Sequence, residues 1–190
     1  MDQEDKKQSN KKKYATADHL TAGDLKSLRK DLGVTQRELA DLVQCSKSTV
    51  ERWEMSSTPI TGPVVLLAQM LQKHPEYLEE IRIPEKKLPL RLWYMFRDRP
   101  CTLIDVNEIE RKVQIRNYTD QLMFRAFGSV ENPDYAMYEE FLESRCFPAG
   151  RDKMKLVLKD LELPFYDPLL IIEKTEGRMA EDEFWIRMEQ

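Results

Sequence analysis

The segment TQRELADLVQCSKSTVERWE, from Thr35 to Glu54, decides the fold of the N-terminal part of the chain. Thr35 and Glu38 have the spacing of a capping box, in which the threonine hydroxyl accepts from the helix backbone and the glutamate reaches back to the cap. After a short turn, Ser46 is a residue type that caps a second helix. The segment therefore predicts two short helices joined by a tight turn.

Apolar residues at helical spacing give each of these two helices one inward face. The inward residues of the first are Leu39, Ala40, Leu42 and Val43, and those of the second are Val50 and Trp53. The opposite face of the second helix then carries Lys47, Ser48, Glu51 and Arg52. Arginine and lysine can bond to guanine, serine to several bases and glutamate to cytosine, while Lys47 and Glu51 can also pair with each other.

Three further helices frame this pair. A leucine stripe at Leu25, Leu28 and Leu32 predicts a helix before it, ended by Gly33. Pro63 opens a fourth helix, and residues 75–82 are expected to form a fifth. Two short helices held rigidly among others are the requirement of a helix-turn-helix, whose second helix enters the major groove of DNA. We therefore expect a five-helix, helix-turn-helix DNA-binding domain over residues 17–83.

The stretch Thr35–Glu54 resembles the Cro/C1-type (XRE) helix-turn-helix family, because Ala40, Val50 and the Trp53-Glu54 end lie where that family has them. The continuation TGPVVLLAQMLQKHPEYLEEIR, from Thr61 to Arg82, is similar to antitoxin regulators of the MqsA and HigA kind. The similarity covers residues 20–83. One departure is Gln44, which stands where the family usually has a glycine, so that a left-handed backbone or a reshaped turn is expected there.

The resemblance implies which residues meet DNA. It places Gln36 against the DNA backbone or a base, Thr49 near a phosphate, and the exposed face of the second helix in the groove. The predicted DNA-binding residues are Gln36, Arg37, Lys47, Ser48, Thr49, Glu51 and Arg52. The alternative is a helix-turn-helix that has become a protein-binding or dimerising module and no longer reads DNA.

The charge of the chain is unevenly spread. The whole chain has 30 Lys and Arg against 34 Asp and Glu, a net charge of -4. From Lys6 to Arg52 there are 11 basic and 6 acidic residues, a balance of +5, whereas from Leu88 to Gln190 there are 15 and 20, a balance of -5. Residues 1–16 hold five of the lysines and are interpreted as a basic flexible arm, either a solvated tail or an arm lying on phosphates.

Several classes of protein are disfavoured. No stretch approaches the roughly 20 apolar residues of a membrane span, and the polar start lacks the apolar core of a secretory signal, so a cytoplasmic protein is expected. Cys45, Cys101 and Cys146 are odd in number and far apart, and only His19 and His74 could join them, so we expect no disulfide, metal or cofactor. No nucleophile–base arrangement is recognisable, and the protein is not expected to be an enzyme.

Residues 84–89, with two prolines, are the predicted linker, and beyond them the pattern changes. Alternating residues predict strands over 90–97, 102–106 and 112–116, and helical stripes then cover 135–142, 154–161, 169–174 and 180–188. The expected fold class is mainly α, with the five-helix domain followed by a smaller α+β domain of short antiparallel strands and then helices. Residues 90–190 would be a partner-binding or dimerisation domain.

The segment FLESRCFPAGRDKMKLVLKDL, from Phe141 to Leu161, is the most distinctive part of this second domain. Arg145 and Arg151 flank a proline break, either as a buried corner paired with carboxylates or as a contact for an anion or protein partner. Together with EKTEGRMAEDEFW, from Glu173 to Trp185, the segment is similar to an uncharacterised bacterial family found with mobile elements. That similarity implies no activity.

One recognition helix contacts too few bases for useful affinity, so such domains usually pair on two half-sites. We therefore expect a homodimer that binds double-stranded DNA at an inverted repeat and represses its own gene, in the manner of an antitoxin. The alternative is an interaction protein whose C-terminal domain binds a toxin or a host factor and whose helix-turn-helix only controls its own gene.

Overall fold

The computed structural model describes residues 13–150 and 152–189, so that most of the predicted basic arm lies outside the described residues. The chain divides into two compact units, Met1–Arg82 (unit 1) and Ile83–Gln190 (unit 2). Unit 2 is the longer of the two, whereas the sequence analysis expected the smaller domain there. No helix in the described ranges is both long and apolar enough to cross a membrane.

The described residues of unit 1 form five helices, as predicted. They are α1 (Ala22–Asp31), α2 (Gln36–Leu42), α3 (Lys47–Met55), α4 (Pro63–Lys73) and α5 (Tyr77–Ile81). The capping box of Thr35 and Glu38 is confirmed, and Ser46 caps α3 by accepting from the backbone of Thr49. Gly62, at φ 97°, precedes the proline that opens α4. The apolar stripes of these helices meet in one core, in which Leu25, Leu39, Ala40 and Val50 are almost completely buried.

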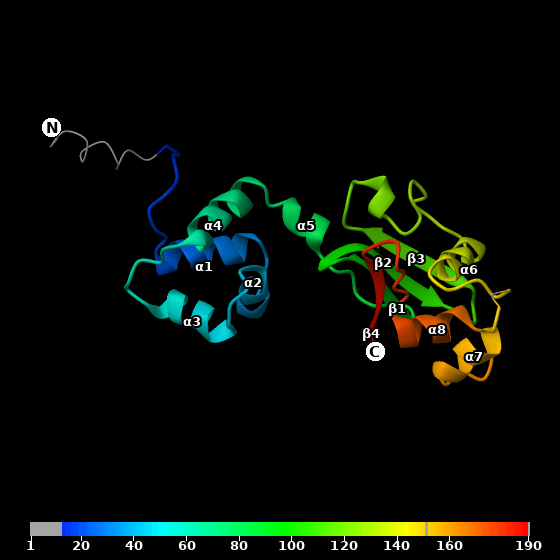
Figure 1. Cartoon of the computed structure of the whole chain (residues 1–190). Coiled ribbons are helices and arrows are strands. Elements are labelled where there is room, and N and C mark those ends of the chain that lie inside the picture. Colours follow the sequence, from blue (N-terminus) through cyan, green and yellow to red (C-terminus); the bar gives the residue numbers. More distant parts are fainter. Residues whose placement is uncertain (1–12, 151, 190) are drawn as a thin grey trace, which may run out of the picture. The chain divides into compact units, whose positions relative to one another are not determined.

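Unit 2 contains a four-stranded antiparallel sheet with helices on one side (Figure 1). The strands are β1 (Leu90–Phe96), β2 (Arg99–Asn107), β3 (Lys112–Asn117) and β4 (Phe184–Glu189), in the order β3-β2-β1-β4. The helices are α6 (Tyr135–Ser144), α7 (Met154–Asp160) and α8 (Pro168–Thr175). Leu92 of β1 and Ile104 of β2 are paired in register and pack with α6 and α8 in the main core.

The last strand corrects the sequence analysis, which predicted a helix over residues 180–188. Phe184–Glu189 is a strand that pairs with β1, and Ile186 faces Tyr94 across the two strands. Phe184, Ile186 and Met188 alternate into the core, so the true apolar period is two. A short apolar run fits the period of a helix or that of a strand. Here the segment forms a strand because it supplies hydrogen-bonding partners to the otherwise unpaired edge of β1.

The other face of the sheet is apolar as well. Trp93, Met95 and Leu103 form a second cluster there, with Tyr118 and Trp185 packed against it. Next to this cluster Arg91 donates two hydrogen bonds to Asp105, of 2.6 and 2.7 Å, and both side chains are buried. Because of these contacts, the side chains on both faces of β1 are buried.

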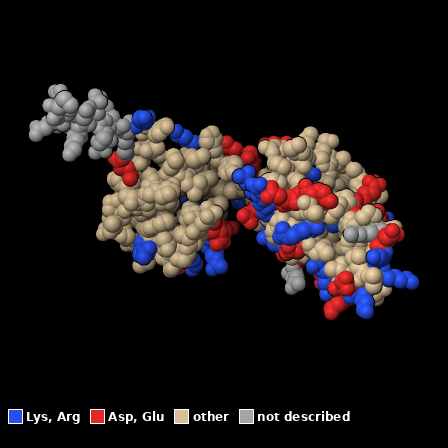
Figure 2. Space-filling model, in the orientation of Figure 1, with Lys and Arg blue, Asp and Glu red and all other residues tan. Residues whose placement is uncertain are grey.

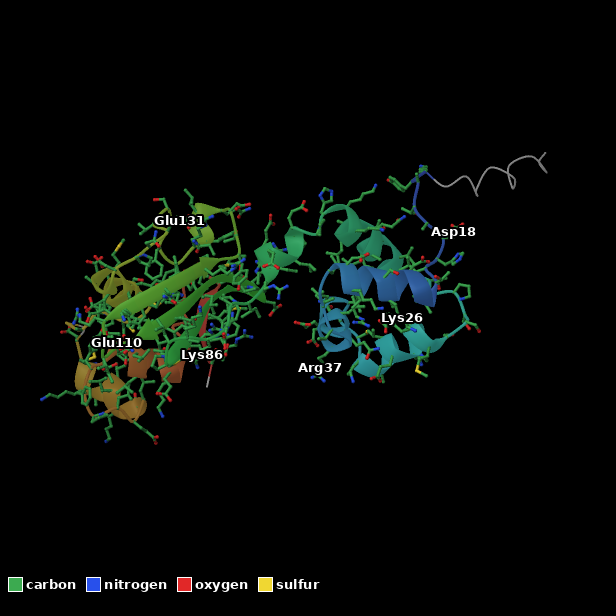
Figure 3. The ribbon with its side chains drawn as sticks, turned by 180° about the vertical axis from the view of Figure 1, so that it is seen from behind. Asp18, Lys26, Arg37, Lys86, Glu110 and Glu131 are labelled. Carbon is green, nitrogen blue, oxygen red and sulfur yellow. The ribbon has the colours of Figure 1, made fainter. Side chains whose placement is uncertain are left out.

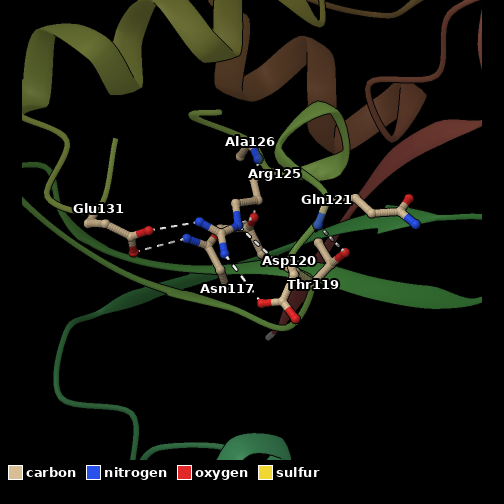
Figure 4. Close-up of polar contacts among 8 residues, drawn as sticks. Asn117, Thr119, Asp120, Gln121, Arg125, Ala126 and Glu131 are labelled. Atoms are coloured by element: carbon tan, nitrogen blue, oxygen red, sulfur yellow. Dashed lines mark hydrogen bonds and ion pairs between the residues drawn. The ribbon is translucent and has the colours of Figure 1, made fainter. Parts of the chain in front are cut away.

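The connection from β3 to α6 is irregular and is fixed by Arg125 (Figure 4). The Arg125 guanidinium donates to the carbonyl of Thr119 at 2.7 Å and to the carboxylate of Glu131 at 2.7 Å, and only 14% of its side chain is exposed. Asn117, at the end of β3, also donates to Glu131. Arg125 therefore holds the two ends of this loop together, and Asn117 attaches the loop to β3.

Candidate nucleic-acid interface

The turn between α2 and α3 has the compact geometry that a helix-turn-helix requires. Gln44 adopts the left-handed conformation, with φ of 52°, so the family's turn geometry is retained without its glycine. The amide of Cys45 donates to the carbonyl of Ala40 at 2.9 Å, which closes the end of α2. Val50 is fully buried between the helices, and Trp53 is half-buried against the same core. These contacts fix the direction of α3 relative to α2.

A buried carboxylate also holds α3 in place. Only 3% of the Glu54 side chain is exposed, and Arg29 of α1 donates to it twice, at 2.7 and 3.3 Å. Gln36, at the start of α2, donates to the same carboxylate at 2.8 Å. Burial by itself would raise the pKa of Glu54, but the hydrogen bonds from Arg29 and Gln36 outweigh burial, and the pKa is lowered. Glu54 therefore joins the first three helices as an ionised carboxylate.

The outer face of α3 presents the predicted polar residues to solvent. Lys47, Ser48 and Arg52 are exposed, and Glu51 and Thr49 are half-buried. Lys47 and Glu51 form an ion pair of 2.8 Å along the helix, as their spacing indicated. Such an exposed pair contributes roughly 0.3–0.5 kcal/mol, so a phosphate or a base can displace Glu51 from Lys47 at little cost.

The predicted residues of α2 differ in what they offer to DNA. Arg37 projects from α2 with 75% of its side chain exposed, and its contact with Asp41 is 3.9 Å long (Figure 3). The amide nitrogen of Gln36 is engaged by Glu54, which leaves its amide oxygen for another contact. The Thr49 hydroxyl lies 2.9 Å from the Ser46 hydroxyl at the start of α3. Arg37 is therefore the freer of the two α2 side chains.

The role of Glu54 and of its partner Arg29 was not predicted from the sequence. The signal was present, because Glu54 follows Val50 by one helical turn and so falls on the inward stripe of α3. A carboxylate on a buried stripe requires a cation or several donors. The separate helix that supplies Arg29 could not be identified from the spacing within α3.

The described residues hold no group of three or more His, Cys, Asp or Glu side chains that could bind a metal ion. Cys45, Cys101 and Cys146 are free thiols. Burial raises the pKa of Cys146 to about 12, which keeps this thiol protonated near neutral pH.

Of the two arginines predicted in the Phe141–Leu161 segment, the structure describes only Arg145. Arg145 is buried, with 7% of its side chain exposed, and its guanidinium donates to both carboxylate oxygens of Asp182 and to the carbonyls of Gly177 and Phe184. This arrangement is the buried corner, and it engages four of the five N–H donors of Arg145 within unit 2. Arg151 lies outside the described residues.

Together, the capped α2, the left-handed turn and the anchored α3 define a helix-turn-helix module. Residues 2–82 match the family model described as the antitoxin component of the bacterial toxin–antitoxin system, MqsA. The match ends at the last residue of unit 1 and confirms the resemblance of this segment to MqsA-type antitoxins. No curated protein and no solved structure matches the chain significantly. The resemblance of unit 2 to a mobile-element family stays a prediction.

Proposed function

We propose that this protein is a sequence-specific DNA-binding regulator of antitoxin type that represses its own gene. The observation that carries the proposal is α3, whose inner face is fixed by Val50 and Glu54 while its outer face exposes Lys47, Ser48 and Arg52. Rigid presentation of these side chains is what direct readout in a major groove demands. The match of unit 1 to an antitoxin family supports the same function.

We further propose that the protein acts as a homodimer on an inverted repeat. A single α3 has nine residues, of which one face can reach base edges, so one copy reads only a few base pairs. Two copies related by a two-fold axis would read two half-sites about one helical turn apart. Residues 90–190 are then the domain that binds a protein partner such as a toxin.

The test is binding of the full chain to the DNA upstream of its own gene, measured by fluorescence anisotropy and footprinting. We expect a paired footprint with two-fold symmetry. The variant Lys47→Ala/Arg52→Ala should bind roughly a thousandfold more weakly or worse, because a dimer loses four base contacts that each contribute about 1–3 kcal/mol.

The matched control is Lys159→Ala/Lys174→Ala, which removes the same charge from exposed positions of unit 2 and should bind like wild type. Equal binding by all three proteins would refute the assignment of α3 as the recognition helix. If the wild-type chain binds no upstream DNA, the alternative of a helix-turn-helix that has become a protein-binding or dimerising module replaces the proposed function.

A further inference from the structure

The two edges of the sheet in unit 2 differ. At the β4 edge, the amide of Ile186 donates to the carbonyl of Glu176 at 2.7 Å, and the carbonyl of Phe184 accepts from Arg145 at 2.9 Å. These bonds attach the end of α8 and the end of α6 to β4. β3 is the opposite edge of the sheet. Because an open edge allows another strand to pair with it, the groups that β3 presents on its outer side decide whether a further strand can bind.

The outward groups of β3 follow from its pairing with β2. Tyr118 directly follows the strand, and its amide donates to the carbonyl of Cys101 at 2.9 Å. In an antiparallel pair, residues that bond to the neighbouring strand alternate with residues whose backbone points away. Counting back from Tyr118 in steps of two reaches neither Val113 nor Ile115, so the backbone of both points away from β2. No described segment is hydrogen-bonded to these outward amides and carbonyls, and an incoming strand can therefore pair with them.

A pocket of about 370 Å³ opens along this edge. Residues 113–116 all line it, although successive side chains of a strand point to opposite faces of the sheet. The pocket therefore lies beside the edge and not over one face alone. Its walls come from the segment before β1, within residues 84–87, and from the loop before α6, at residues 131–133. Asn117 donates to Glu131 and holds that loop beside the end of β3 (Figure 4).

The lining of the pocket favours an extended peptide as its ligand. The β3 side chains on the helix side are apolar and half-buried against the main core. The carboxylates of Asp105 and Glu131 are already bonded to arginines of unit 2. Glu85, Lys87 and Arg116 also line the pocket, so that neither sign of charge dominates it. The groups that await partners are backbone amides and carbonyls, which are the groups that an extended peptide satisfies.

The charge of unit 2 indicates what kind of molecule supplies this peptide. Leu88–Gln190 has 20 acidic and 15 basic residues. Asp and Glu form several groups on the visible face of unit 2, with Lys and Arg between them (Figure 2). An excess of acidic residues attracts a basic partner and repels phosphates. A basic protein therefore fits unit 2 better than a nucleic acid does.

We propose that β3 is a docking edge, to which an extended apolar segment of a basic partner protein adds as a fifth, antiparallel strand of the four-stranded sheet. The residue opposite Ile115 then has its side chain on the same face as Ile115 and its amide directed at β3. Apolar side chains at such positions extend the main core, on which Val113 and Ile115 already pack. The inference rests on the proposed function only for the role of unit 2 as a partner-binding domain.

The test uses the full chain and a short labelled peptide of alternating valine and threonine with lysine at both ends. Fluorescence anisotropy measures binding, and NMR follows amide hydrogen exchange. We expect the amides of Val113 and Ile115 to exchange rapidly in the free chain and roughly tenfold or more slowly with the peptide bound. Methylating the amide nitrogens of the valines should weaken binding roughly tenfold or more, because each lost hydrogen bond contributes about 0.5–1.5 kcal/mol. Methylating those of the threonines, which point away from β3, should leave binding unchanged and keeps the charge of the peptide the same.

A proline variant tests the same edge from the side of the protein. Ile115→Pro removes an outward amide of β3 and should weaken peptide binding roughly tenfold or more. Met188→Pro is the matched control, because Met188 follows Ile186 by two residues and so directs its amide to the outer side of β4, and it should bind like wild type. The circular dichroism spectrum checks that both variants fold, and the methylated peptides test the wild-type chain independently of the variants.

Three results would each overturn the inference. They are a peptide that stays unbound at millimolar concentrations, amides of Val113 and Ile115 that are protected in the free chain, and equal binding of the two methylated peptides. A folded Ile115→Pro variant that binds like Met188→Pro would do the same. A chain that binds the peptide as expected but no upstream DNA would support the inference and contradict the proposed function, whereas one that binds the DNA but not the peptide would do the reverse.

Discussion

At the scale of single residues, Glu54 fixes the position of the recognition helix α3 within unit 1. Its carboxylate is buried and accepts hydrogen bonds from Arg29 of α1 and Gln36 of α2. The same interaction raises the pKa of Arg29, chiefly through the hydrogen bond to Glu54, so both groups are charged together. Removing one partner of such a pair leaves the other charge without compensation.

Glu54→Gln should therefore lower the free energy of unfolding by about 2–3 kcal/mol, because it removes the negative charge beside Arg29 without changing side-chain size. Denaturant titration followed by circular dichroism measures the change. Glu51→Gln is the control, because it alters a half-exposed carboxylate of the same helix and should cost under about 0.5 kcal/mol. Equal losses in the two variants would contradict the structural role of Glu54.

The same variant has a pH signature. The pKa of Glu54 in the folded chain lies below its ordinary value of 4.5, so its stabilisation is present above pH 4.5 and is lost as the pH falls through the folded pKa. Wild-type stability should decrease more steeply below pH 4.5 than that of Glu54→Gln, and the difference between the two should shrink there.

Single residues also show what sequence could and could not predict. The inward pair Val50 and Trp53 follows from helical spacing. The left-handed Gln44 is one of two outcomes implied by the resemblance to a family that has glycine at this position. The Lys47–Glu51 pair follows from helical spacing alone. The Arg29–Glu54 contact joins residues 25 positions apart and depends on how α1 crosses α3, which no local pattern contains.

At the scale of elements, unit 2 depends on a corner in which α6, the turn after α8 and β4 meet. Arg145 ends α6 and binds Asp182, Gly177 and Phe184. Gly177 has a positive φ, and an added Cβ would lie only 3.3 Å from Cβ of Arg145. The corner therefore needs glycine as well as arginine, and together they direct the chain back to the sheet as β4.

Arg145→Met should reduce the free energy of unfolding by about 3 kcal/mol, because it leaves the Asp182 carboxylate and two carbonyls without their donor. Chemical denaturation would measure the loss, and slow amide exchange in β1 and β4 should become faster. Arg178→Ala is the control, because Arg178 is exposed, pairs with Glu176 and stacks on the Trp185 ring, and its loss should cost only about 1 kcal/mol. Wild-type stability of Arg145→Met would show that the corner is dispensable.

The elements themselves were predictable to different degrees. The alternation in β1 and the helical stripes of α6 and α8 were strong enough to place these elements from sequence. β4 was wrongly predicted as a helix, because its six residues fit both periods and its partner strand β1 lies far back in the sequence. Long-range strand pairing is decided by the free edge of the sheet, which sequence periodicity does not record.

At the scale of the whole molecule, the net charge of -4 conceals two opposite local balances. The segment Lys6–Arg52, which includes the first six residues of α3, has a balance of +5, and Leu88–Gln190 has one of -5. Phosphates respond to the charges within about a Debye length, roughly 8–10 Å at physiological salt, and not to the sum over the chain. An acidic protein can therefore bind DNA through a basic region.

The salt dependence of DNA binding tests this separation of charge. Affinity falls with salt because bound cationic side chains release counterions from DNA, with a slope of about -0.9 in log–log form per phosphate neutralised. Lys47→Ala/Arg52→Ala and Lys159→Ala/Lys174→Ala have the same net charge, but only the first loses cations from α3. The first should show a slope that is shallower by about 2–4 for a dimer, and the second should keep the wild-type slope. Equal slopes for the two variants, measured by anisotropy over a salt series, would mean that the net charge governs binding and that the basic balance of Lys6–Arg52 has no special role.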